Sequence, residues 1–238
     1  MSHCILRHIP NTLTCLNLFS GCLAVVMAFH GEPKLAFGFI MLSAIFDFFD
    51  GLAARAFDAH SPIGKDLDSL ADDVSFGVAP AAMLYNLLMQ IASTEAWEGA
   101  RALLPYLSFL IAVFSALRLA KFNNDTRQST SFIGLPVPAN ALFWASLVLI
   151  FTDGSRLHPL LADWAFPITL AIVALVLLFS WLLVSEIPMF SLKKIKGNRT
   201  IVIFCCGTLP LLALCSMKAF VPIIIWYVLL SLISNGKK

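Results

Sequence analysis

Charged residues are scarce in this chain. Asp, Glu, Lys and Arg make up 13% of its 238 residues, against 59% hydrophobic residues, whereas about 25% of a typical soluble domain is charged. The mean hydropathy is +0.87. The composition therefore excludes an ordinary soluble domain and predicts an integral membrane protein. The net charge of +2 gives no reason to expect nucleic acid as a partner.

The sequence also lacks zinc-site spacings, an internal repeat and a cleavable leader. Its 6 Cys residues lie in or beside apolar runs, and its 5 His residues form no pair at metal-ligand spacing. We interpret the cysteines as small buried hydrophobic residues. The N-terminal stretch MSHCILRHIPNTLTCLNLFSG has no small-residue cleavage site after a compact apolar core. We therefore expect the first apolar segment to be retained, and residues 1–238 to form a single transmembrane domain.

Long apolar runs dominate the chain instead. A membrane-spanning helix needs about 20 mostly apolar residues. Eight segments meet this requirement, at 10–30, 34–57, 64–90, 101–121, 134–152, 160–186, 199–217 and 219–235. The prediction is an all-α, polytopic membrane protein with about eight transmembrane helices and both termini on the same side.

Lys and Arg are distributed unevenly between the two sides of this arrangement. Of the 16 basic residues, 12 fall on the side of the termini. They are Arg7, Arg55, Lys65, Arg118, Lys121, Arg127, Lys193, Lys194, Lys196, Arg199, Lys237 and Lys238. The other side has Lys34, Arg101, Arg156 and Lys218. Because basic loops stay in the cytoplasm, we expect cytoplasmic termini in the inner (cytoplasmic) membrane, with contacts to membrane lipids.

An aspartate-rich stretch, DFFDGLAARAFDAHSPIGKDLDSLADD, begins at Asp47, at the predicted cytoplasmic end of two helices. Positions three or four apart share a helical face, so Asp47 and Asp50 face together, as do Asp68 and Asp72. A short loop lets the two helices pack side by side, so the four carboxylates converge. Charges in a membrane are costly, and a hard cation bound by oxygen ligands relieves their repulsion.

Small residues lie on the same helical faces, at Gly51, Ala54 and Gly64. They allow helices to approach closely, and they also leave room for a flat ligand against the backbone. Helix packing alone is the alternative explanation. The neighbouring carboxylates favour a ligand pocket.

Together these residues form the pattern D-x2-D-G-x2-A-R-x8-G-x3-D-x3-D over residues 47–72. The pattern resembles, at every position, the signature of the CDP-alcohol phosphotransferase family. The resemblance implies a six-helix core and a metal-dependent transfer from a CDP-linked lipid to an alcohol, with release of CMP. It also implies that Asp47, Asp50, Asp68 and Asp72 hold one or two Mg²⁺ or Mn²⁺ ions, and that Asp72 is also the catalytic base.

The resemblance also assigns residues to the binding of the CDP-linked lipid. These are Gly51, Ala54, Arg55 and Gly64 within the signature, together with Asn11, Thr14 and Ser61. Asn11 and Thr14 lie three apart on one helical face, where an N-cap with packing contacts is the alternative explanation. Asp73 points to a different face from Asp72 and is left out of the predicted site.

Four further stretches resemble the phosphatidylserine synthases within this family. They are IPNTLTCLNLFSG, DSLADDVSFGVAP, ALRLAKFNNDTRQSTSFIGLPVPANA and PMFSLKKIKG. The resemblance implies CDP-diacylglycerol and L-serine as substrates, two helices added to the core at the C-terminus, and a homodimer. It departs at the N-terminus, where only about nine residues precede the first helix, too few for the full interfacial helix of many relatives.

A free carboxylate on the acceptor favours Arg, whose planar group matches it. Arg118 and Lys121 lie three apart at a predicted cytoplasmic helix end, and Arg127 follows in the loop. We predict that these three bind the carboxylate of serine or the lipid phosphate. Anchoring at the cytoplasmic surface is the alternative.

Other functions remain open at this point. Another family member would use glycerol phosphate, inositol or inositol phosphate as the acceptor. A divalent-cation transporter also places acids in a membrane, but such proteins often show internal repeats and acids near the midplane. An inactive scaffold is disfavoured because every signature residue is present.

Overall fold

The computed structural model describes residues 8–58, 62–95, 98–125, 132–152, 164–190 and 199–235. Within these residues the regular structure is helical apart from two strands of two residues each, β1 (Phe132–Ile133) and β2 (Pro188–Met189), which pair antiparallel. The helices are α2 (Ile9–Phe29), α3 (Pro33–Ala56), α4 (Pro62–Asp72), α5 (Ala79–Glu95), α6 (Leu110–Asn124), α7 (Val137–Thr152), α9 (Ala165–Val184), α10 (Arg199–Cys215) and α11 (Phe220–Asn235). Shorter helical segments are η1 (Asp73–Val78), η2 (Gly99–Phe109) and η4 (Ser216–Ala219).

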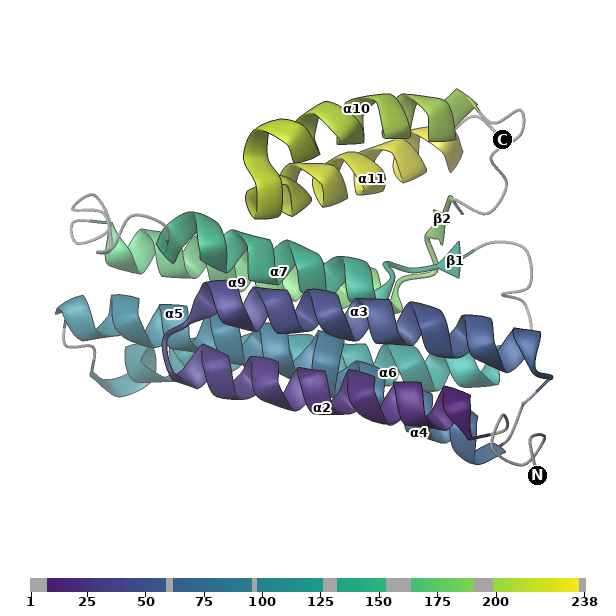
Figure 1. Ribbon diagram of the computed structural model, residues 1–238. Helices are drawn as coiled ribbons and strands as arrows, with labels where there is room; N and C mark the ends of the chain where they lie inside the picture. The colour runs from purple at the N-terminus through teal and green to yellow at the C-terminus, as the bar shows by residue number, and fades with distance from the viewer. Residues whose placement is uncertain are drawn as a thin grey trace.

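In the described part of the chain, six helices are long and apolar enough to cross a membrane: 9–29, 33–56, 63–93, 99–124, 165–184 and 201–234. The last stretch bends at η4, so that α10 and α11 lie side by side as a hairpin (Figure 1). Helix α7 is apolar but shorter, with 16 residues. The prediction of an all-α membrane protein is confirmed, whereas the count of eight spans is not.

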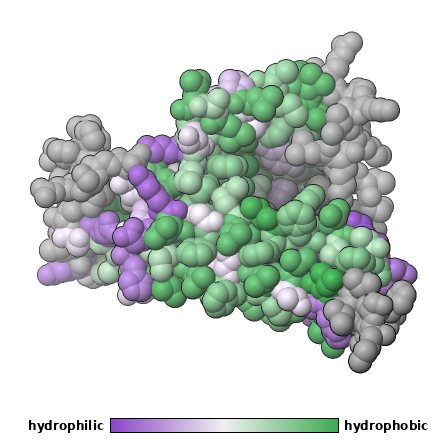
Figure 2. All heavy atoms as spheres, viewed as in Figure 1, coloured by the Kyte–Doolittle hydropathy of each residue, from purple (hydrophilic) through white to green (hydrophobic). Residues whose placement is uncertain are grey.

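The surface fits a membrane environment. Large apolar side chains face outward, with Phe19 61%, Phe48 61% and Leu209 69% exposed. Figure 2 shows hydrophobic residues over the middle of one face and hydrophilic residues towards its two ends. Exposing so many apolar side chains to water is unfavourable, so this surface suits contact with lipid.

The segment from α4 through η1 to α5 forms one continuous central helix. It contacts α2, α6, α7 and α9. Its middle, η1, is a π-helical segment, and such segments are frequent at functional sites. A close approach to α2 requires Gly21, because a Cβ there would lie 2.2 Å from Ser75 Oγ.

The N-terminal hairpin of α2 and α3 packs along this central helix (Figure 1). Each of its helices has Pro in the first turn, where the missing N–H costs nothing. Figure 1 shows the end of α3 and the start of α4 at the same end of the bundle as the start of α2. This arrangement brings the ends of α3 and α4 beside the start of α2, where the aspartates lie.

Candidate active site

Three carboxylates meet between α3 and α4, both of which pack against α2. An oxygen from each of Asp47, Asp50 and Asp68 lies within 4.8 Å of the other two. Helix spacing explains the set: Asp47 and Asp50 are three apart on α3, and Asp68 faces them from α4. The predicted convergence of these acids is present.

The cluster suits a divalent cation. Among the described residues, none of its carboxylates forms an ion pair with Lys or Arg. Three negative charges at this separation repel one another strongly in the low dielectric of a membrane protein. Carboxylate oxygens are the ligands that Mg²⁺ and Mn²⁺ prefer. The donor set therefore fits the predicted metal site, and Asp47, Asp50 and Asp68 would hold the ion.

The fourth aspartate of the signature, Asp72, has a different setting. It lies at the end of α4, is 9% exposed, and is not part of the group of oxygens within 4.8 Å of one another. It remains within electrostatic range of all three carboxylates. The side-chain amide of Asn17, on α2, donates a hydrogen bond to Asp72 Oδ1 at 3.1 Å. This carboxylate lies next to the cluster and is oriented by a neighbouring helix.

Thr14 also supports the cluster. Its hydroxyl donates a hydrogen bond to Asp50 Oδ2 at 2.7 Å, a bond between buried groups on α2 and α3. Hydrogen bonds to an ionised acceptor are short and strong. Thr14, predicted to contact the lipid substrate, therefore also orients a predicted metal ligand.

A cavity of about 250 Å³ opens beside the carboxylates. Six of the seven residues predicted for binding the CDP-linked lipid line it, namely Asn11, Thr14, Gly51, Ala54, Arg55 and Gly64. The seventh, Ser61, lies outside the described residues. A Cβ on Gly51 would lie 3.6 Å from an Arg55 guanidinium nitrogen. The small residues therefore border open space next to a positive charge, as a nucleotide pocket requires.

The three predicted acceptor residues have different surroundings. Arg118, on α6, is 7% exposed, and its Nε has no hydrogen-bond partner among the described residues. It lies within electrostatic range of Asp72 and Tyr227. Lys121 Nζ donates to the carbonyl of Val184 at 3.1 Å and lies 3.9 Å from Glu186. Arg127 lies outside the described residues. The structure places Arg118 within electrostatic range of Asp72 and engages Lys121 with the end of α9.

Sequence reasoning missed two residues near the site. Asn17 follows Thr14 by three positions on α2, a spacing that placed it on the same face. Lys65 lines the cavity, and its Nζ donates to the backbone carbonyl of Asn123 at 2.8 Å. Only the packing of α4 against α6 shows this contact.

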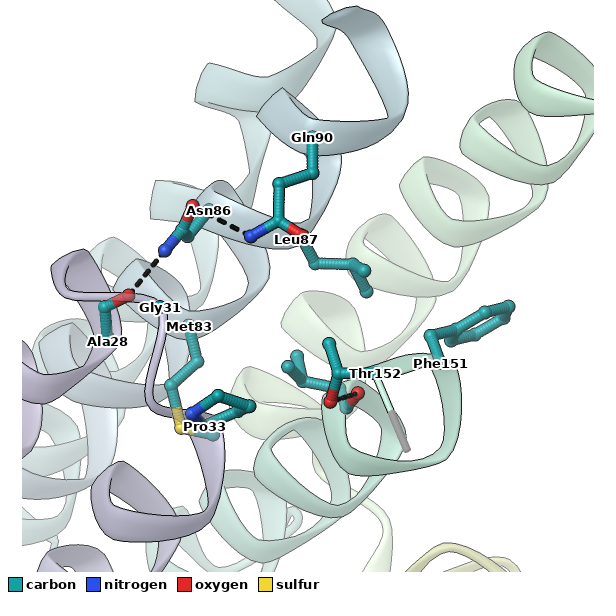
Figure 3. A pocket seen from close by; sticks show the side chains of 10 residues that line it. Ala28, Gly31, Pro33, Met83, Asn86, Leu87, Gln90, Phe151 and Thr152 are labelled. Atoms are coloured by element: carbon teal, nitrogen blue, oxygen red, sulfur yellow. Dashed lines mark hydrogen bonds between the residues drawn. The ribbon is translucent and has the colours of Figure 1, made fainter. Parts of the chain in front are cut away.

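A second cavity, of about 200 Å³, lies by the turn between α2 and α3, at the other end of these helices from the aspartates (Figure 3). Its polar groups pair with each other or with the backbone: Asn86 donates to the carbonyl of Ala28, and Gln90 donates to Asn86 at 3.3 Å. Of the described residues lining it, none is charged. This cavity has no group suited to acid–base or metal chemistry.

The chain belongs to the CDP-alcohol phosphatidyltransferase family, whose sequence model matches residues 7–179. It is similar to the CDP-diacylglycerol--serine O-phosphatidyltransferase of Mycobacterium bovis, with 31% identity over 95% of this chain and 76% of the relative. The enzyme of the same name from Bacillus subtilis is 33% identical over 79% of this chain and 93% of its own length. An archaetidylserine synthase of Methanothermobacter thermautotrophicus is 34% identical over 59% of this chain and 58% of its own length.

Proposed function

We propose that this protein transfers the phosphatidyl group of CDP-diacylglycerol to L-serine, giving phosphatidylserine and CMP. The proposal rests on the carboxylate cluster of Asp47, Asp50 and Asp68, which lies beside a cavity lined by small residues and Arg55. The names of the relatives indicate serine as the acceptor.

The substrate carries a pyrophosphate, so the site must bind negative charge. We assign Asp47, Asp50, Asp68 and Asp72 to one or two Mg²⁺ or Mn²⁺ ions, which neutralise the pyrophosphate oxygens when bound. Arg55 lies near the nucleotide, and the glycines leave space for the cytidine. Asn11, Thr14, Ala54 and Ser61 complete this pocket.

Asp72 acts as the general base. A serine hydroxyl is a weak nucleophile at neutral pH, and a carboxylate within hydrogen-bond distance accepts its proton. The hydroxyl oxygen then attacks the phosphorus that carries diacylglycerol, and the bond from that phosphorus to the bridging oxygen of CMP breaks. CMP leaves with the electron pair, and the proton stays on Asp72 until water removes it.

Arg118 is the strongest candidate for binding the carboxylate of serine. Its charge is buried, its Nε has no partner in the part of the chain that the structure describes, and it lies within electrostatic range of Asp72. A buried guanidinium with an unpaired donor is unfavourable, and a carboxylate ligand completes it. Lys121 and Arg127 are proposed as further contacts of the carboxylate or the lipid phosphate.

The proposed arrangement in the membrane is a single domain of eight spans in the cytoplasmic membrane, with both termini and the site facing the cytoplasm. It is supported by the excess of Lys and Arg on that side. A pocket there meets water-soluble serine while the acyl chains stay in lipid. We also propose a homodimer, on the family resemblance alone.

An acceptor panel tests the proposal. Purified protein is given CDP-diacylglycerol, Mn²⁺ or Mg²⁺, and one of serine, glycerol phosphate, inositol or inositol phosphate. We expect product with serine at a kcat/KM at least about 100-fold above the others. Buried polar groups of the site that pair with serine are left unpaired by an acceptor that lacks the matching groups. Preferential use of glycerol phosphate or inositol phosphate would assign the chain to another activity of the same family.

A further inference from the structure

Asn17 is a fully buried polar residue beside the proposed base. Its side chain is 0% exposed, and its amide donates to Asp72 Oδ1 at 3.1 Å. A carboxylate that binds a donor through one oxygen keeps its other oxygen free to accept a proton. The contact therefore orients the Asp72 carboxylate through Oδ1, and Oδ2 is the oxygen that Asn17 does not contact.

The backbone of Asn17 is held by two neighbouring elements. The hydroxyl of Ser43, on α3, donates to its carbonyl at 3.0 Å, and the hydroxyl of Ser75, on η1, donates to the same oxygen at 3.1 Å. Both serines are buried. Three segments of the chain therefore meet at Asn17, and η1 follows Asp72 directly.

The amide of Asn17 has only one correct orientation. An ionised carboxylate is an acceptor only, so the amide nitrogen faces Asp72 and the amide oxygen faces away. That oxygen is buried and has no hydrogen-bond partner among the described residues. Burying an unpaired acceptor costs free energy, whereas Leu of similar volume would avoid this cost. Among the described residues, the contact with Asp72 is the hydrogen bond that this side chain makes.

We propose that Asn17 is a positioning residue for this enzyme: it acts through Asp72, holding the carboxylate so that its free oxygen receives the proton of the acceptor hydroxyl. The proposal rests on the proposed function, in which Asp72 is the base. Ser43 and Ser75 fix the position of Asn17 and so connect α2, α3 and η1 to that carboxylate.

A double-mutant cycle tests the proposal. Asn17→Leu, Asp72→Asn and the double variant are compared with wild type for serine transfer, and CDP-diacylglycerol binding is titrated to count intact sites. We expect Asn17→Leu to lower kcat about 10-fold or more per intact site and Asp72→Asn about 100-fold or more. If Asn17 acts through Asp72, adding Asn17→Leu to Asp72→Asn lowers kcat no further.

The matched control is Asn140→Leu, on α7. Asn140 is also fully buried, with one side-chain hydrogen bond, from Trp144 Nε1 at 3.0 Å, and an unpartnered amide nitrogen. We expect unchanged kcat per intact site. Should Asn17→Leu fold poorly, Asn17→Ala takes its place in the cycle.

The outcomes separate the two claims. Equal losses from Asn17→Leu in the wild-type and Asp72→Asn backgrounds would show a structural role and overturn the proposal. So would an unchanged kcat in Asn17→Leu. Full activity in Asp72→Asn, or wild type that does not use serine, would instead overturn the proposed function.

Discussion

Replacing Asp47 with Asn should raise the stability of the metal-free protein and reduce the stability that metal binding adds. Asp47 belongs to two of the close pairs among three carboxylates whose oxygens lie within 4.8 Å. At this distance, two unit charges repel by about 3.5 kcal/mol at an effective dielectric constant of about 20. Asn has nearly the same shape but no charge, so the variant is relieved of two such repulsions.

The sum of about 7 kcal/mol is an upper limit, because water and shared protons relieve part of the repulsion. A surviving gain of only about 1 kcal/mol would raise the Tm by about 2–4 °C in a chain of this size. With metal the order reverses. Wild type gains about 2.7 kcal/mol when the free ion reaches about 100 times its Kd, and the variant gains less because it has lost a ligand.

The assay is thermal unfolding of purified protein in one detergent, first with excess EDTA and then across a Mn²⁺ titration. Asp47→Asn should have the higher Tm in EDTA and the smaller rise with Mn²⁺. Asp66→Asn, an exposed aspartate of the same helix as Asp68, is the control and should change neither. A Tm for Asp47→Asn that is below wild type in both conditions would refute the reasoning.

Three further changes test other parts of the structure. Gly51→Leu should abolish CDP-diacylglycerol binding in a titration while the protein still inserts, because its side chain fills the cavity, whereas retained binding with impaired folding would favour packing alone. Gly21→Ala should destabilise the protein by about 1–3 kcal/mol, since its Cβ would lie 2.8 Å from Ser75 Cα; an unchanged Tm would contradict the close approach. Arg118→Lys keeps the charge but loses the planar group, so the KM for serine should rise with CDP-diacylglycerol affinity intact, and an unchanged KM would place the carboxylate site elsewhere.

The sequence was sufficient for the parts of the site that lie within one helix. Asp47 and Asp50 share a face because of the helical repeat alone, and the same repeat set Gly64 and Asp68 on one stripe. Both helices pack against α2, and Asp68 on α4 lies close to Asp47 and Asp50 on α3. The predicted residues of these two helices, Gly51, Ala54, Arg55 and Gly64, therefore line one cavity.

Contacts between helices distant in sequence were not predictable in the same way. The hydrogen bonds from Thr14 to Asp50 and from Asn17 to Asp72 join residues 36 and 55 positions apart, and they depend on how α2 packs. The π-helical segment η1 has no signal in apolar periodicity. Spacing predicted that Lys121 and Arg118 bind the same ligand group, and only the packing of α6 shows that the Lys121 ammonium contacts Val184 and Glu186.

The most direct test of the account measures both products of one reaction. Purified protein is incubated with CDP-diacylglycerol, labelled serine and Mn²⁺, and CMP and labelled phosphatidylserine are counted together, with EDTA and with Asp72→Asn as parallel reactions. If the proposed metal-dependent transfer is correct, we expect one CMP for each phosphatidylserine. Both products should be lost in EDTA and reduced about 100-fold or more in Asp72→Asn. Undiminished phosphatidylserine formation in EDTA, or CMP released without it, would contradict the account.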